Sequence, residues 1–136
     1  MNRPILLSYF MLTGCSDTLT GALLVVAPGF TLRLMQLRVP EESLVFLSFI
    51  GAFVFAVGLS FLYGAYIAFQ GESKTKIEVV WLLTAFTRAS VAIFVVQQVL
   101  ALTLDPGWLT VAAADSTCVL IQAVGLYKGW LANVAR

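Results

Sequence analysis

Four long apolar segments constrain what this chain can fold into more than any other feature. They cover residues 5–27, 44–69, 77–102 and 108–132. Each segment exceeds the roughly 20 residues that an α-helix needs to cross about 30 Å of hydrocarbon at about 1.5 Å per residue. None of them alternates with a period of two, which disfavours a β-barrel. The sequence therefore predicts an all-α fold, in which residues 1–136 form a single integral membrane domain of four transmembrane helices.

The composition agrees with a membrane protein. Hydrophobic residues make up 60% of the chain and charged residues only 11%, whereas soluble domains carry about 25% charged residues. Eight basic residues against seven acidic ones give a net charge of +1. This balance provides no basic surface for nucleic acid. The sequence contains no histidine, which excludes haem or zinc ligation through imidazole and catalysis by a histidine base.

The connection between the first two segments has a pattern of its own. Phe30, Leu34 and Leu37 recur at positions i, i+4 and i+7, a spacing that places them on one face of a helix. We expect residues 29–39 to form a short helix that lies in the membrane interface. A structured loop is the alternative.

The distribution of basic residues predicts the orientation in the membrane. With the N-terminus in the cytoplasm, five basic residues lie inside: Arg3, Lys74, Lys76, Lys128 and Arg136. Only Arg33 and Arg38 then lie outside. Because cytoplasmic loops carry the excess of Lys and Arg, we expect both termini in the cytoplasm.

Three charged residues lie deep inside the apolar segments: Asp17, Arg88 and Asp115. A charge at the bilayer centre costs about 2.5–3.5 kcal/mol on insertion scales, so such residues usually face the bundle interior and pair. Helical rise places the three at about 15, 21 and 10 Å from the outer ends of their helices. This predicts an Asp17–Arg88 pair. Asp115 lies nearer the outer surface, and we expect it to join through a water or through the amide of Gln122. Asp17, Arg88, Asp115 and Gln122 are therefore the candidate polar or ligand site, and no residue is assigned as catalytic or metal-binding.

Small residues share a face with these charges, whereas bulky residues occupy the opposite faces. This pattern predicts a compact four-helix bundle, because small residues let membrane helices approach closely. The candidate packing residues are Gly14, Gly21, Gly51, Gly58, Gly125 and Gly129. Cys15 and Cys118 both lie in apolar segments, which argues against a disulfide framework.

The order of the segments and several residues within them carry a family likeness. These residues are Leu12-Thr13-Gly14 with Asp17 and Gly21, Pro28-Gly29-Phe30, Leu32-Arg33-Leu34-Met35, Arg88 and Asp115. On these residues the chain resembles small bacterial four-helix membrane proteins of the DoxX-like kind. Their name comes from association with thiosulfate:quinone oxidoreductase. The resemblance implies a multi-pass protein of the bacterial inner membrane, and it transfers no catalytic residue to this chain.

Three functions are compatible with these features. The first is a non-enzymatic accessory subunit that packs within a larger respiratory or photosynthetic membrane complex, or as a homo-oligomer. We favour it because 136 residues leave no extramembrane domain and the glycine-bearing faces offer close contacts. The second is binding or transport of a hydrophobic ligand (a quinone, lipid or carotenoid) at the buried Asp/Arg site. The third is an enzyme that uses Asp17 or Asp115 as an acid–base group. The expected partners are the lipid bilayer and other membrane subunits or a second copy, and not nucleic acid.

Overall fold

The computed structural model describes residues 3–71 and 74–133, and the regular elements of these ranges are helices. The four long helices are α1 (Arg3–Val26), α3 (Leu44–Phe69), α4 (Lys74–Leu100) and α5 (Leu109–Tyr127). The short ones are α2 (Pro28–Leu34), η1 (Glu41–Ser43), η2 (Pro106–Trp108) and η3 (Trp130–Asn133). The long helices, with η1 extending α3 and η2 extending α5, are long and apolar enough to cross a membrane. The predicted all-α fold with four such helices is confirmed.

The predicted boundaries agree best for α3, which covers the expected residues 44–69. The fourth helix is shorter than predicted, because α5 ends at Tyr127 and not at residue 132. Gly129 adopts φ of +63° and has no neighbouring heavy atom within 4 Å of a Cβ built on it. Glycine adopts this left-handed conformation without steric cost, and helices commonly end on such a residue. Gly129 therefore ends α5, and among the described residues no atom packs against it; its prediction as a helix-packing residue stays a prediction.

The first connection contains the predicted short helix, but α2 ends at Leu34 and not at residue 39. Pro28 occupies its first turn, a position where the missing N–H costs nothing. The helix stops because Gln36 adopts a left-handed conformation with φ of +57°. The backbone N–H of Leu37 then donates to the carbonyl oxygen of Leu32 at 2.9 Å, which satisfies a carbonyl at the helix end.

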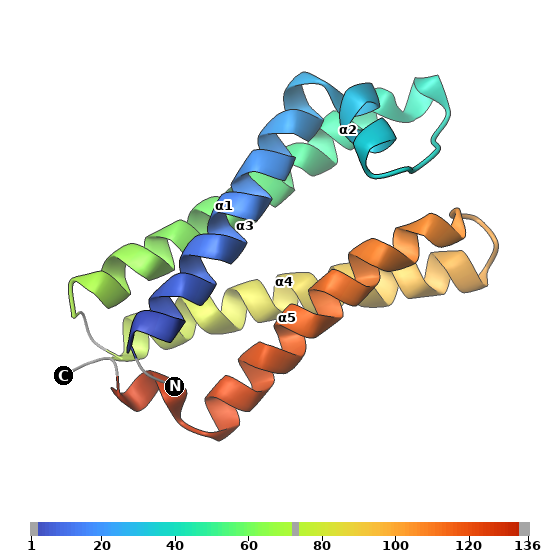
Figure 1. Cartoon of the computed structure of the whole chain (residues 1–136). Helices are drawn as coiled ribbons and strands as arrows, with labels where there is room; N and C mark the ends of the chain where they lie inside the picture. Colours follow the sequence, from blue (N-terminus) through green and yellow to red (C-terminus); the bar gives the residue numbers. More distant parts are fainter. Residues whose placement is uncertain (1–2, 72–73, 134–136) are drawn as a thin grey trace.

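The long helices are arranged as two antiparallel pairs, α1 with α3 and α4 with α5 (Figure 1). Among the described residues, the α1–α3 contact is the most extensive, the α4–α5 contact follows, and the α3–α4 contact is smaller. The two pairs lie close together at the end that carries the chain termini and diverge toward the end that carries α2 (Figure 1). This arrangement is more open than the compact bundle that the sequence predicts.

Glycines explain why α1 and α3 form the closest pair. A Cβ built on Gly21 would lie 2.3 Å from the backbone nitrogen of Phe55, and one built on Gly58 would lie 2.3 Å from that of Thr18. The two backbones therefore touch, and a side chain at either glycine would force them apart. Gly14 and Gly51, both predicted for packing, also lie in this contact. The fifth predicted glycine, Gly125, lies against the Trp81 ring between α4 and α5.

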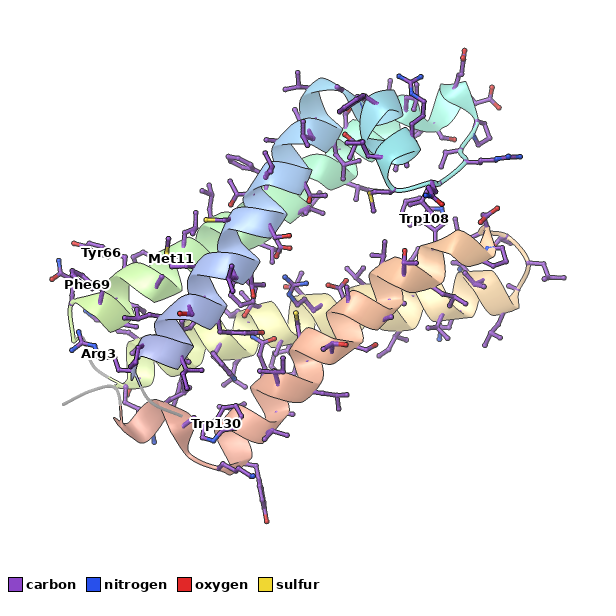
Figure 2. All side chains as sticks on the ribbon, in the orientation of Figure 1. Arg3, Met11, Tyr66, Phe69, Trp108 and Trp130 are labelled. Atoms are coloured by element: carbon purple, nitrogen blue, oxygen red, sulfur yellow. The ribbon has the colours of Figure 1, made fainter. Side chains whose placement is uncertain are left out.

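Two apolar clusters join the helical pairs at opposite ends of the molecule. The larger cluster lies near the termini and consists of Leu6, Phe10, Phe61, Ala65, Ile67, Ala68, Ile77, Trp81 and Leu131. The smaller cluster lies at the opposite end, where Leu32, Leu37 and Leu47 pack against Trp108. Figure 2 shows Trp108 on the α4–α5 side, directed toward the segment that follows α2. Arg88, which is buried, and Asp17 and Asp115, which are half-buried, lie between these two clusters.

Candidate functional site

Arg88 is the centre of a buried ionic cluster that links three helices. It lies in the middle of α4, and only 7% of it is exposed. Its Nη2 donates to Oδ2 of Asp17 on α1, and its Nη1 donates to Oδ1 of Asp115 on α5. The structure thus brings together all three charges of the apolar segments. Each amino group of the guanidinium has its own carboxylate, and this fork geometry is one that arginine is suited to form.

The fourth long helix contributes an aromatic ring to the same cluster. The guanidinium carbon of Arg88 lies 5.1 Å from the centroid of the Phe61 ring on α3. A cation over an aromatic face at this distance is attracted by the ring quadrupole. All four long helices therefore meet at Arg88, although α1 and α3 form one pair and α4 and α5 the other.

The position of Asp17 follows from the packing of α1. Gly14 and Gly21, at i−3 and i+4 from Asp17, lie against α3, whereas the Asp17 carboxylate accepts from Arg88 on α4. Residues three and four apart share one side of a helix, so α1 contacts both neighbours with adjacent parts of a single side. This is why a stripe of small residues next to the aspartate permits the ion pair.

Gln122 has a different role from the one that its spacing suggested. Its Nε2 donates to the carbonyl oxygen of Trp81 at 3.0 Å and to Oγ1 of Thr84 at 2.8 Å. In return, Nε1 of Trp81 donates to the carbonyl oxygen of Gln122 at 2.8 Å. These bonds join α4 to α5 near the termini, and Asp115 reaches Arg88 without the amide. Gln122 therefore lies outside the ionic cluster.

Four buried polar atoms of this region have no hydrogen-bond partner among the described residues. They are Nε of Arg88, the hydroxyl oxygen of Tyr9, Oγ1 of Thr18 and Oε1 of Gln122. The Tyr9 side chain lies near Arg88, Asp17 and Cys118, and its ring packs against those of Phe61 and Trp81. Tyr9 was not among the predicted site residues, because a tyrosine near a helix end is typical of the membrane interface. The signal was its spacing, since Tyr9, Thr13 and Asp17 follow one another at four-residue steps.

The cluster offers limited chemistry of its own. Two carboxylates around one guanidinium carry a formal charge of −1, and both carboxylates already accept from Arg88. Cys15 and Cys118 are free cysteines. Among the described residues no group of three or more His, Cys, Asp or Glu side chains is placed to hold a metal ion. The N–H of Arg88 Nε has no acceptor among the described residues, and the Tyr9 hydroxyl has only the Cys118 thiol beside it.

Comparison with protein-family models, with curated proteins and with solved structures finds no match to this chain. The likeness to DoxX-like proteins therefore stays a prediction from the sequence.

Proposed function

We propose that this protein is a small, non-enzymatic integral membrane protein that serves as an accessory subunit. It packs within a larger membrane complex, of the respiratory or photosynthetic kind, or against further copies of itself. The observation that carries the proposal is the ionic cluster. Arg88 binds a carboxylate with each amino group, so the deep charges hold the two helical pairs together. The apolar outer surface of the helices is then the part of the chain that can contact other membrane proteins.

The outer surface of α3 supports a packing role. Phe46, Phe49 and Phe53 follow one another at steps of three and four residues, and between 60% and 69% of each is exposed. The rings of Phe49 and Phe53 meet edge to face with centroids 4.9 Å apart. Aromatic residues supply large contact areas in protein interfaces. Ala56 continues this ridge at the next step of three and is also exposed, which allows another helix to approach.

The charges at the two ends of the helices support the orientation with both termini in the cytoplasm. Four basic residues lie at or beyond helix ends on the side of the termini: Arg3, Lys74, Lys76 and Lys128. Within residues 3–71 and 74–133, the acidic residue at this end is Glu78. The opposite end carries Arg33 and Arg38 together with Glu41, Glu42 and Asp105. The positive-inside rule then places the terminal end in the cytoplasm and α2 at the outer interface. The bacterial inner membrane is the proposed location.

Site-specific photo-cross-linking tests the subunit proposal. A photoreactive residue is placed at Phe53, and a matched one at Leu83, which is exposed on α4. In native membranes we expect position 53 to yield one discrete adduct, with a second copy or with another membrane protein. We expect position 83 to yield lipid adducts. Lipid adducts alone at both positions, together with recovery of a free monomer from two mild detergents, would refute the subunit role.

A second candidate function is the binding of a hydrophobic ligand with a polar end, such as a quinone or a lipid. The observation that favours it is a pair of buried donors that have no oxygen acceptor among the described residues, the N–H of Arg88 Nε and the Tyr9 hydroxyl, which lies beside the Cys118 thiol. Both can donate to a ligand oxygen, and leaving buried donors unpaired is costly. Organic extraction of the purified protein followed by mass spectrometry tests this function. A stoichiometric ligand that is lost in Tyr9→Phe supports it, and the absence of any such ligand refutes it.

A further inference from the structure

A groove on the outside of the α1–α3 pair lies apart from the ionic cluster. Its volume is about 310 Å³, and its walls are almost entirely apolar. It is lined by Leu7, Met11, Leu62, Ala65, Tyr66 and Phe69. Met11, Tyr66 and Phe69 lie on the same side of the molecule, near the terminal end (Figure 2). An apolar groove of this kind accommodates a hydrocarbon chain.

Arg3 stands at the terminal end of the groove. Arg3, Leu7 and Met11 follow one another at four-residue steps on α1, so they lie along one side of the helix. The Arg3 Nη2 group donates to the carbonyl oxygen of Phe69, a residue that lines the groove. Figure 2 shows Arg3 beside Phe69. This bond fixes the guanidinium at the last turn of α3, where a carbonyl has no partner within its own helix.

The groups at this end of the groove complement a phosphate. A guanidinium has five N–H donors, and the bond to Phe69 uses one of them. The remaining donors suit a phosphate, which arginine binds in a bidentate manner. Nearby, Nε2 of Gln70 donates to the Tyr66 hydroxyl oxygen at 3.3 Å, so the Tyr66 proton stays available for donation. Lys74, which starts α4 at the same end, is already paired with Glu78 at 3.1 Å, so Arg3 is the cation that this end of the groove offers.

We propose that this groove binds one anionic phospholipid. One acyl chain lies along the groove between Arg3 and Met11, a distance of about 12 Å by helical rise, and the phosphate binds Arg3. Basic groups beside a membrane-facing groove on the cytoplasmic side select anionic headgroups in this way. The inference rests on the proposed function in one respect, because the groove meets lipid only if the helices span a membrane.

A second groove of similar size serves as an internal control. It lies between α3 and α4, has a volume of about 280 Å³ and is also mainly apolar. Its lining residues are Leu59, Ser60, Tyr63, Val80, Leu83 and Thr84. No basic residue belongs to this lining. It is therefore expected to accept acyl chains without preference for a headgroup.

Native mass spectrometry of the purified full chain tests the proposal. The protein is incubated with equal amounts of palmitoyl-oleoyl-phosphatidylglycerol and palmitoyl-oleoyl-phosphatidylcholine, which differ only in the headgroup. We expect one phosphatidylglycerol molecule to bind in preference to phosphatidylcholine. In Arg3→Gln this preference falls by about fivefold or more, as expected for the loss of one basic group near an anionic headgroup. Lys128→Gln, an equal charge change at the same end but away from the groove, retains the preference.

Two further variants separate the groove from general charge effects. Met11→Trp fills the groove and abolishes the bound phosphatidylglycerol, whereas Leu83→Trp fills the control groove and leaves it in place. Arg3→Lys keeps the charge and a large part of the preference. Equal losses in Arg3→Gln and Lys128→Gln, or unchanged binding in Met11→Trp, would overturn the proposal. Circular dichroism of each variant verifies that the helices are intact.

Failure of the proposed function gives a different result. A protein that does not span the membrane is released from isolated membranes by alkaline carbonate. Retention of the protein in carbonate-washed membranes without a headgroup preference rejects the lipid site alone.

Discussion

Replacing Arg88 by leucine should destabilise the protein more than replacing all three charges of the ionic cluster together. Arg88 is 7% exposed, and it binds both carboxylates. Arg88→Leu therefore leaves Asp17 and Asp115 without their cation inside the helical bundle. Breaking a buried ion pair by removal of one partner costs about 3–5 kcal/mol. We expect the free energy of unfolding to fall by this amount.

The triple variant Asp17→Leu/Arg88→Leu/Asp115→Leu removes the attraction and the desolvation cost together. Well-packed apolar replacements of a buried ionic group are often neutral, or stabilising by about 1–4 kcal/mol. We expect the triple variant to be at least as stable as the parent protein. The double variant Asp17→Leu/Arg88→Leu still holds Asp115 without its cation, so its stability should fall between the two.

The assay is unfolding by sodium dodecyl sulfate in mixed micelles, followed by tryptophan fluorescence. Trp81 is a suitable reporter, because it is fully buried against Tyr9 and Phe10. Thr87→Leu, an exposed position beside Arg88, is the control and should change stability by less than about 0.5 kcal/mol. If the single and triple variants lose the same stability, the loss comes from packing at position 88, and the assignment of the cluster as an ionic clamp is wrong.

Three further changes test other contacts. Gly21→Ala should lower the free energy of unfolding by about 1–3 kcal/mol or more, because it overpacks α1 against α3. The control Gly29→Ala, whose added Cβ would have its nearest contact 4.0 Å away, should be nearly neutral. Equal effects of the two changes in chemical unfolding would contradict the close contact. Gln122→Leu should cost about 1–3 kcal/mol, because it removes two hydrogen bonds between α4 and α5, and a shift in near-ultraviolet circular dichroism should accompany the loss. Trp108→Ala should increase the distance between the helical pairs at the α2 end, because Trp108 packs against the cluster that contains Leu37. An unchanged distance distribution between spin labels on α2 and α5 would show that this contact does not hold the pairs together.

The helices themselves could be predicted from the sequence, because their signal is local. Length and apolar composition define α3 at its observed bounds. The end of α5 was predicted too late, since Trp130, Leu131 and Ala132 continue the apolar composition after Lys128. The helix ends before them because of the backbone conformation of Gly129. A hydrophobic pattern contains no information about a left-handed residue, whereas glycine permits one. The same reason applies to Gln36, where nothing in the residue type announced the end of α2.

The candidate site could be predicted in part. The depth of a residue follows from its position along its own helix, whereas its contacts with other helices depend on how the helices pack. Helical rise placed Asp17 and Arg88 within reach of each other, and it left Asp115 about 10 Å nearer the surface than Arg88. That estimate treats the helices as parallel to one another and to the membrane normal. In the structure the two pairs diverge (Figure 1), so equal rise on two helices does not mean equal height.

The ionic cluster also explains why so open an arrangement holds together. For helices that span a membrane, as proposed for this chain, the bilayer supplies no hydrophobic force between them, so association depends on close packing and polar contacts. Close glycine contacts join α1 to α3, and hydrogen bonds of Trp81 and Gln122 join α4 to α5. Between the pairs, however, the direct contact of α3 with α4 is small. The two carboxylates that Arg88 binds come from different pairs, Asp17 from α1 and Asp115 from α5. Loss of Asp17 would remove the ionic contact between the pairs, whereas loss of Asp115 would remove one within the α4–α5 pair. The ionic contact between the two pairs therefore offsets the free-energy cost of placing three charges deep in apolar helices.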